Sequence, residues 1–122
     1  MAVVMVVDDD AETRSTLTTY LTRRGHRVNS ASQGKEAIEK MTEDPADVVI
    51  LDAVMPKVDG VEFLEVLRCY LRWQDTPVIM ITAYAEMLQS SEHPLPAVDY
   101  MISKPFLLDD LREAIARVSA RK

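Results

Sequence analysis

Short apolar runs alternate along the chain with longer segments in which apolar residues recur at helical spacing. Unbroken runs of Val, Ile, Leu and Met fill residues 3–7, 48–51 and 78–81. Because no polar residues alternate within these runs, both faces of each strand should be buried, as in a parallel sheet covered by helices. Residues 26–30 predict a weaker strand at an edge of the sheet, and residues 98–102 predict a fifth strand.

The segments between the runs predict helices. Asp10 is placed to cap a first helix that stops at Gly25, and Ser32 to cap a second helix that ends before Asp44. Residues 60–73 predict a third helix. It is apolar over a wide arc, with one stripe formed by Leu64, Leu67 and Leu71 and a second by Phe63, Val66, Tyr70 and Trp73. Because a helix that covers a sheet needs one apolar face, the second stripe either widens the buried face or forms a surface for a partner or a homodimer.

The remaining helices complete a regular alternation. A fourth helix is expected from Ala83, and Pro94 and Pro96 limit it to about two turns. A last helix is expected from about residue 107 to 120. Strands and helices thus follow one another as (βα)5, and right-handed crossovers between parallel strands give a three-layer, doubly wound α/β fold. We expect a single domain spanning residues 1–122.

Composition narrows the partners and the location. The 122 residues suit one compact domain, and 14 basic against 20 acidic residues give a formal charge of −6. An acidic chain without a basic cluster is a poor ligand for nucleic acid, so no direct contact with nucleic acid is expected. A single cysteine, Cys69, excludes an internal disulfide. No segment approaches the roughly 20 apolar residues that span a bilayer. We therefore expect a cytoplasmic protein that binds metal cations or basic partner surfaces and stays out of the membrane.

Polar side chains follow four of the five expected strands. Asp8 and Asp9 end the first strand, Asp52 ends the third and Thr82 the fourth, and Lys104 follows the fifth. In doubly wound sheets, ligands bind beyond the carboxyl ends of the strands, near the switch in strand order. We therefore expect these side chains to converge on one site, although each alone is a weak signal.

The residue types at this site favour phosphoryl chemistry. Carboxylates about 4 Å apart repel one another by roughly 4 kcal/mol per pair at an effective dielectric near 20, and a bound cation relieves this repulsion. Oxygen ligands favour Mg²⁺, with Mn²⁺ as the alternative. Attack of the Asp52 carboxylate on phosphorus requires neutralisation of the phosphoryl oxygens, for which Lys104 supplies an ammonium group and Thr82 a hydroxyl donor. We also expect a cis bond between Lys104 and Pro105 that aims the lysine inward, although only about 5–6% of X–Pro bonds are cis.

These segments resemble, from end to end, the receiver domain of two-component response regulators of the chemotaxis-regulator (CheY-like) type. The matching stretches are Val-Val-Asp8-Asp9-Asp10, Ile-Leu-Asp52-Ala-Val-Met-Pro56 with Asp59-Gly60, Ile-Thr82-Ala83, and Ser-Lys104-Pro105-Phe106. The resemblance implies a flavodoxin-like fold with strand order 2-1-3-4-5. It also implies a phosphorylation-dependent switch in a phosphorelay, whose phosphoryl donor is a histidine kinase or a histidine phosphotransfer protein.

The resemblance further assigns roles to the site residues. Asp52 would take the phosphoryl group. Asp9, Asp52 and the backbone carbonyl of Val54 would hold Mg²⁺, while Asp8 assists through water. Thr82 and Ala83 would bind the phosphoryl group as part of the switch, and Lys104 would pair with it.

The position three residues before the lysine departs from the family pattern. The family usually places Tyr or Phe there, whereas this chain has Met101, with Tyr100 one residue earlier. Because neighbours in a strand point to opposite faces, Tyr100 cannot take the place of the missing ring. We expect the flexible Met101 to support a looser version of the switch.

Other functions fit the sequence less well. An aspartate-nucleophile phosphatase would need a second acid two residues after the nucleophile, where this chain has Val54. A pseudo-receiver used only for protein contact would not need Asp52, Thr82 and Lys104 together. We therefore expect no enzyme with a separate substrate, but a domain that assists only its own phosphorylation and dephosphorylation. Its downstream protein target is unknown, and the chain is either a stand-alone receiver or one excised from a larger transcriptional regulator or hybrid kinase.

Overall fold

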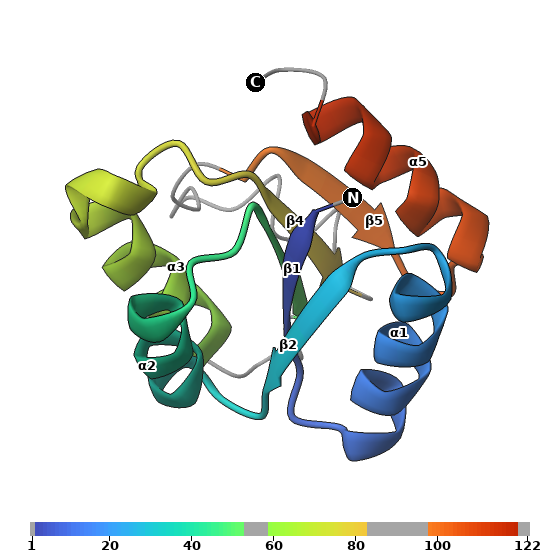
Figure 1. The fold of residues 1–122 in the computed structure, drawn as a ribbon, viewed down its shortest axis with the longest axis horizontal. Helices are drawn as coiled ribbons and strands as arrows, with labels where there is room; N and C mark the ends of the chain where they lie inside the picture. Colours follow the sequence, from blue (N-terminus) through green and yellow to red (C-terminus); the bar gives the residue numbers. More distant parts are fainter. Residues whose placement is uncertain (1, 53–58, 83–97, 120–122) are drawn as a thin grey trace.

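The structure, a computed structural model, describes residues 2–52, 59–82 and 98–119 (Figure 1). The strands are β1 (Val3–Val7), β2 (Arg27–Ala31), β3 (Val48–Asp52), β4 (Val78–Thr82) and β5 (Tyr100–Ser103). The helices are α1 (Ala11–Arg23), α2 (Gly34–Glu43), α3 (Asp59–Cys69) and α5 (Leu108–Ser119), with a short 3₁₀ helix η1 at Leu71–Trp73. The fourth helix expected from the sequence lies outside the described residues.

The strands form one parallel sheet in the order β2-β1-β3-β4-β5. This order confirms the doubly wound, flavodoxin-like arrangement. It also explains the hydropathy of the strands. Every residue of the inner strands β3 and β4 is buried. The more polar strand β2 is the first strand in the order, so it lies at an edge of the sheet as expected, and most of its residues are only partly buried.

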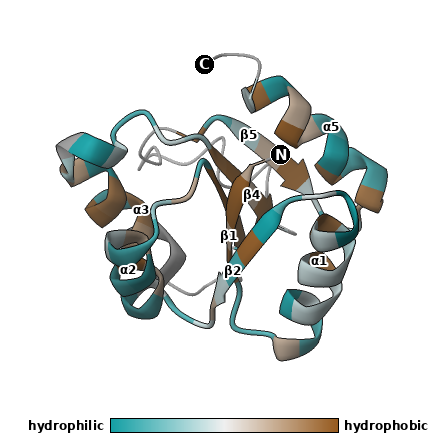
Figure 2. Cartoon of the chain, viewed as in Figure 1, coloured by the Kyte–Doolittle hydropathy of each residue, from teal (hydrophilic) through white to brown (hydrophobic). Residues whose placement is uncertain are grey.

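Helices cover both faces of the sheet. In Figure 1, α2 and α3 lie on one side and α1 and α5 on the other. Successive residues of β1 therefore enter different cores: Met5 joins the cluster under α2 and α3, while Val4 and Val6 join the cluster under α1 and α5. Figure 2 shows β1 and β4 as strongly hydrophobic in the middle of the fold, whereas β2 carries hydrophilic as well as hydrophobic residues.

The first helix follows its sequence signals. Asp10 has extended backbone geometry, and its carboxylate accepts from the Thr13 amide at 3.3 Å, which makes it the N-cap of α1. After the helix ends, Gly25 adopts a φ of 91°, a left-handed conformation that glycine adopts without a steric penalty. Both ends of α1 are therefore as predicted.

The expected cap of the second helix was wrong by one residue. The N-cap of α2 is Gln33, which is extended and makes no side-chain capping bond. Ser32 lies one position too early to reach the free amides of the first turn. Instead, the Glu36 carboxylate reaches back and accepts from the Ser32 amide at 2.6 Å.

The last helix, α5, lies where it was expected, whereas the third differs from its prediction. The third was expected to continue to residue 73, but α3 ends at Cys69 and the chain tightens into η1. Its second apolar stripe is divided, because Phe63 and Trp73 are buried while Val66 and Tyr70 are each 42% exposed. The helices of the described part are all too short or too polar to cross a membrane.

Candidate functional site

Four of the strands deliver polar side chains to the same edge of the sheet. Asp8 and Asp9 directly follow β1, Asp52 and Thr82 are the last residues of β3 and β4, and Lys104 directly follows β5. Since all strands run in parallel, their carboxyl ends meet at one edge, and β3 lies between β1 and β4. The Lys104 amide donates to the Thr82 carbonyl at 2.9 Å, which ties the ends of β4 and β5 together.

Asp52 and Lys104 form the central contact of the site. The Lys104 ammonium donates to Asp52 Oδ2 at 2.6 Å, across 52 positions in the chain. The Asp52 side chain is only 3% exposed, whereas that of Lys104 is 32% exposed. The carboxylate is therefore held in place, while the more open ammonium group can shift without leaving a cavity in the core.

Asp8 and Asp52 form a buried pair of carboxyls. Asp8 is 1% exposed, and burial raises its pKa from 3.8 to about 7, helped by the hydrogen-bonding and charge interaction with Asp52 and opposed in part by the Asp10 amide and Lys104. Apart from the bond that the two acids share when Asp8 is protonated, the buried oxygens Asp8 Oδ2 and Asp52 Oδ1 accept from no group in the described part of the chain. The pair thus presents two oxygens that favour a proton or a cation between them.

Two further residues of the expected site, Asp9 and Thr82, differ in their exposure to solvent. Asp9, directly after β1, is exposed, and Thr82, the last residue of β4, is completely buried. Within the described ranges, no group of three or more His, Cys, Asp or Glu side chains is arranged to hold a metal ion. Asp8 and Asp52 form the buried part of the expected site, and the exposed Asp9 directly follows Asp8 in the chain.

The donor chemistry of the pair nevertheless suits Mg²⁺. Its two unpartnered oxygens are hard carboxylate donors, the type that Mg²⁺ prefers. A Mg²⁺ ion keeps several waters and takes only one or two carboxylates from the protein, so a two-acid site is sufficient for it. The Val54 carbonyl, expected as a further ligand, lies outside the described residues, as does Ala83.

The remaining sequence predictions concern β5 and the residue after it. Tyr100 packs against the core cluster under α1 and α5, while Met101 packs against the cluster under α2 and α3, so the two lie on opposite faces as expected. The Lys104–Pro105 peptide bond is cis, as expected.

Sequence reasoning missed Arg14. This half-buried residue on α1 donates from Nη1 to the Asp8 carbonyl at 2.7 Å. Its one signal in the sequence is a cation in the early turns of a helix, where the helix dipole disfavours positive charge. Such a placement indicates a specific partner for the guanidinium group.

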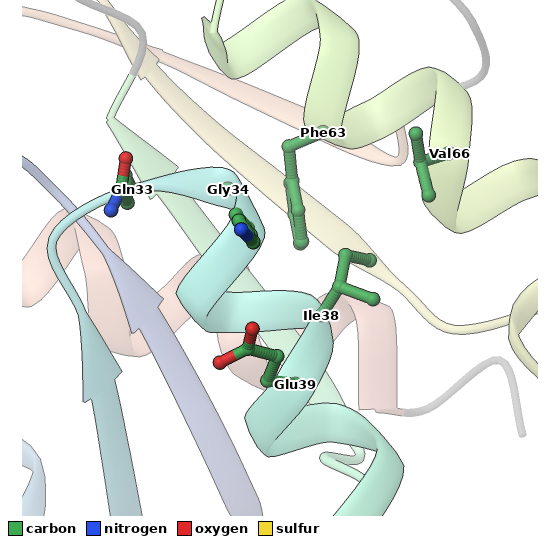
Figure 3. A pocket seen from close by; sticks show the side chains of 7 residues that line it. Gln33, Gly34, Ile38, Glu39, Phe63 and Val66 are labelled. Atoms are coloured by element: carbon green, nitrogen blue, oxygen red, sulfur yellow. The ribbon is translucent and has the colours of Figure 1, made fainter.

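A separate hollow lies between α2 and α3, with a volume of about 410 Å³ (Figure 3). Its described lining residues are Gln33, Gly34, Lys35, Ile38, Glu39, Phe63 and Val66. None of these is a predicted site residue. The acidic cluster and the hollow are therefore distinct features.

Comparison with solved structures supports the same architecture. The chemotaxis response regulator CheY4 of Vibrio cholerae is 30% identical and superimposes with a TM-score of 0.86, over 97% of this chain and 98% of that one. The response regulator TrrA from Thermotoga maritima, solved with Mg²⁺ and BeF, is 31% identical with a TM-score of 0.81, over 97% and 99% of the two chains.

Sequence comparison identifies the family. The Bacillus subtilis transcriptional regulatory protein ResD is 37% identical over 96% of this chain and 46% of its own length. The Pseudomonas aeruginosa transcriptional regulatory protein GltR is 34% identical over 96% of this chain and 47% of its own. The chain thus spans about half the length of these curated relatives. Residues 4–116 match the response regulator receiver domain. Together with the fold, this match shows that the chain belongs to the family of receiver domains that act as signalling switches in two-component systems.

Proposed function

We propose that Asp52 is the phosphoryl acceptor of this receiver domain and that phosphorylation there switches its signalling state. The donor would be the phosphohistidine of a histidine kinase or of a histidine phosphotransfer protein. The observation that carries the proposal is the buried Asp52 carboxylate, which contacts the Lys104 ammonium at 2.6 Å and lies beside Asp8. Since a histidine kinase obtains its phosphoryl group from ATP, the proposal places the reaction in the cytoplasm.

In the proposed reaction, an oxygen of Asp52 attacks phosphorus. A new O–P bond forms, the N–P bond of the phosphohistidine breaks, and the imidazole leaves with that electron pair. Lys104 then pairs with a phosphoryl oxygen. Because its side chain is ten times more exposed than that of Asp52, it can follow the charge from the carboxylate to the phosphoryl group.

The acidic residues would hold Mg²⁺, with Mn²⁺ as the alternative. We assign Asp9, Asp52 and the Val54 carbonyl as ligands and Asp8 as a residue that acts through a bound water. When bound, the ion neutralises charge on the phosphoryl oxygens. The two buried oxygens, Asp8 Oδ2 and Asp52 Oδ1, support this assignment, since no other group of the described residues donates to them.

The switch would involve Thr82 and Ala83, which would contact the phosphoryl group from the end of β4. Met101 packs against the core under α2 and α3 and occupies the position of the usual aromatic residue. We propose that its flexible side chain adjusts its packing when Thr82 moves. The domain would assist only the gain and loss of its own phosphoryl group and would turn over no separate substrate.

Incubation with acetyl phosphate and Mg²⁺ tests the proposal directly. Intact-protein mass spectrometry should show the addition of one phosphoryl group to the wild type, and none to Asp52→Asn or to the wild type in EDTA. Asp75→Asn, which removes an exposed carboxyl outside the site, serves as the matched control and should react like the wild type. Equal modification of wild type and Asp52→Asn would refute the assignment.

A further inference from the structure

Arg14 contacts the phosphorylation site through the backbone. Its guanidinium donates to the Asp8 carbonyl at 2.7 Å, and the two residues are six positions apart. That carbonyl belongs to the peptide unit that joins Asp8 to Asp9. Because a peptide unit is planar, a bond to its oxygen also fixes the direction of the Asp9 amide and the start of the Asp9 residue. Arg14 is therefore placed to orient both acids of the turn.

The other polar groups of Asp8 are restrained as well. Its amide donates to the Ala31 carbonyl at 3.0 Å, which continues the pairing of β1 with β2. Its Oδ1 accepts from the Asp10 amide at 2.8 Å. Oδ2 then faces Asp52, and within residues 2–52, 59–82 and 98–119 no group outside this pair donates to it or to Oδ1 of Asp52. The geometry of the carboxyl pair thus depends on how firmly the Asp8 peptide is held, and Arg14 provides the one side-chain bond to that peptide among those described here.

A carboxylate on α2 lies within electrostatic range of Arg14. Glu36 accepts from the Ser32 amide at 2.6 Å. That hydrogen bond lowers the pKa of Glu36, and Lys40 and Arg14 lower it further by charge. The Arg14 guanidinium, which is bonded to the turn after β1, thus also senses a negative group on α2.

We propose that Arg14 is a positioning residue for the acidic site: it holds the Asp8–Asp9 peptide in the orientation that binds Mg²⁺ and so sets the rate of phosphorylation of Asp52. The inference rests on the function proposed above for Asp52. It requires no contact between Arg14 and the phosphoryl group.

Three variants test this role. Arg14→Met keeps the aliphatic stem but removes every donor, and it should weaken Mg²⁺ binding about tenfold, as is typical when a partner of a metal ligand is lost. Arg14→Lys retains one donor and should recover most of the affinity. Arg23→Met removes an exposed arginine from the other end of α1 and is the matched control, expected to match the wild type.

Mg²⁺ titration followed by amide chemical shifts measures the affinity of each variant for the ion. Incubation with acetyl phosphate at several Mg²⁺ concentrations measures the rate of phosphorylation. The rate of Arg14→Met should approach that of the wild type as Mg²⁺ is raised.

A measurement on metal-free protein separates positioning from general stability. Arg14→Met should speed hydrogen exchange of the Asp10 amide, which bonds to Asp8, while amides in β3 and β4 keep their protection. The inference is overturned if Mg²⁺ affinity and the Asp10 amide both stay within about twofold of the wild type. It is also overturned if all amides lose protection together, since that pattern reports only lost stability. If the wild type itself is not phosphorylated, the function proposed for Asp52 fails, and the metal titration and amide exchange still decide the role of Arg14.

Discussion

Asp8 lies at the end of β1 with its carboxyl buried against Asp52, and its pKa is raised from 3.8 to about 7, chiefly by burial. The folded state therefore binds this proton more tightly than the unfolded chain does. The resulting stabilisation is complete below about pH 4 and is lost as the pH rises through about 7. In metal-free protein, Asp8 should thus make folding less favourable as the solution becomes neutral.

We expect the free energy of unfolding in EDTA to fall by about 2–3 kcal/mol between about pH 5 and pH 7 through this group, at 1.36 kcal/mol per pH unit. Urea denaturation at several pH values measures it. Asp8→Asn should remove most of the fall, while Asp75→Asn, at an exposed position, should retain it. Identical pH profiles for wild type and Asp8→Asn would show that Asp8 ionises in the folded protein as it does in the unfolded chain.

The contact between Lys104 and Asp52 leads to a second prediction at this scale. Lys104→Met leaves the buried Asp52 carboxylate without its cation and should destabilise the metal-free protein by about 3 kcal/mol at neutral pH. In an Asp52→Asn background, the same change should cost less than about 1 kcal/mol, because the buried charge is gone. Lys35→Met, at an exposed position on α2, is the control and should have little effect in either background. Equal costs for Lys104→Met in both backgrounds would show that the two residues are not coupled.

The elements are joined at the opposite edge of the sheet by Arg68 on α3. Its Nη1 donates to the carbonyls of Trp73, Gln74 and Thr76 at 3.1, 3.0 and 2.7 Å, and its Nη2 contacts Asp99 at 3.2 Å. Asp99 also accepts from the Val78 amide at 2.8 Å, at the start of β4. The Arg68 side chain is only 14% exposed. One guanidinium group therefore connects α3, the turn after η1 and the starts of β4 and β5.

We expect Arg68→Met to destabilise the domain by about 3 kcal/mol, because it leaves several carbonyls and a carboxylate of low exposure without a donor. Arg68→Lys should recover part of this, since an ammonium group keeps the charge but cannot reproduce the planar fork. Urea denaturation measures the free energy of unfolding of each variant. Arg112→Gln breaks a pair with Asp109 in which both side chains are more than half exposed, and it should cost less than about 1 kcal/mol. A similar cost for Arg68→Met and Arg112→Gln would contradict the assigned role.

At the scale of the whole molecule, the strands and their order were predictable, while several helix ends were not. Burial on both faces leaves an unbroken apolar run, so β3 was visible in the sequence within one residue of its end. The ends of α2 and α3 depend instead on contacts beyond local propensity. Glu36 reaches back over the start of α2, and Arg68 draws together the carbonyls after α3. Such contacts leave little trace in hydrophobic periodicity.

The site was predictable for a related reason. Parallel strands end at a common edge, so Asp8, Asp52 and Lys104 could be expected to meet from their positions alone. The exposure of Asp9 could not be foreseen, because the sequence alone does not show which of the two neighbouring acids, Asp8 or Asp9, is buried. The contact of Arg14 could not be predicted, because its partner is a backbone carbonyl and every residue type carries one.

The two cores on either side of the sheet should melt as one unit, because every strand of the sheet is shared between them. Trp73, the only tryptophan, is buried in the cluster under α2 and α3, whereas Leu111 is buried in the cluster under α1 and α5. Leu111→Ala should cost about 3 kcal/mol by leaving a cavity on its own face. If the cluster under α1 and α5 unfolds, the sheet that supports the Trp73 cluster becomes exposed to solvent on its other face. We therefore expect Leu111→Ala to lower the urea midpoint seen by Trp73 fluorescence and by far-UV circular dichroism to the same extent.

Leu64→Ala, on the Trp73 side, provides the reciprocal control and should shift both midpoints together as well. A fluorescence midpoint that stays at the wild-type value in Leu111→Ala would show instead that each face of the sheet folds on its own.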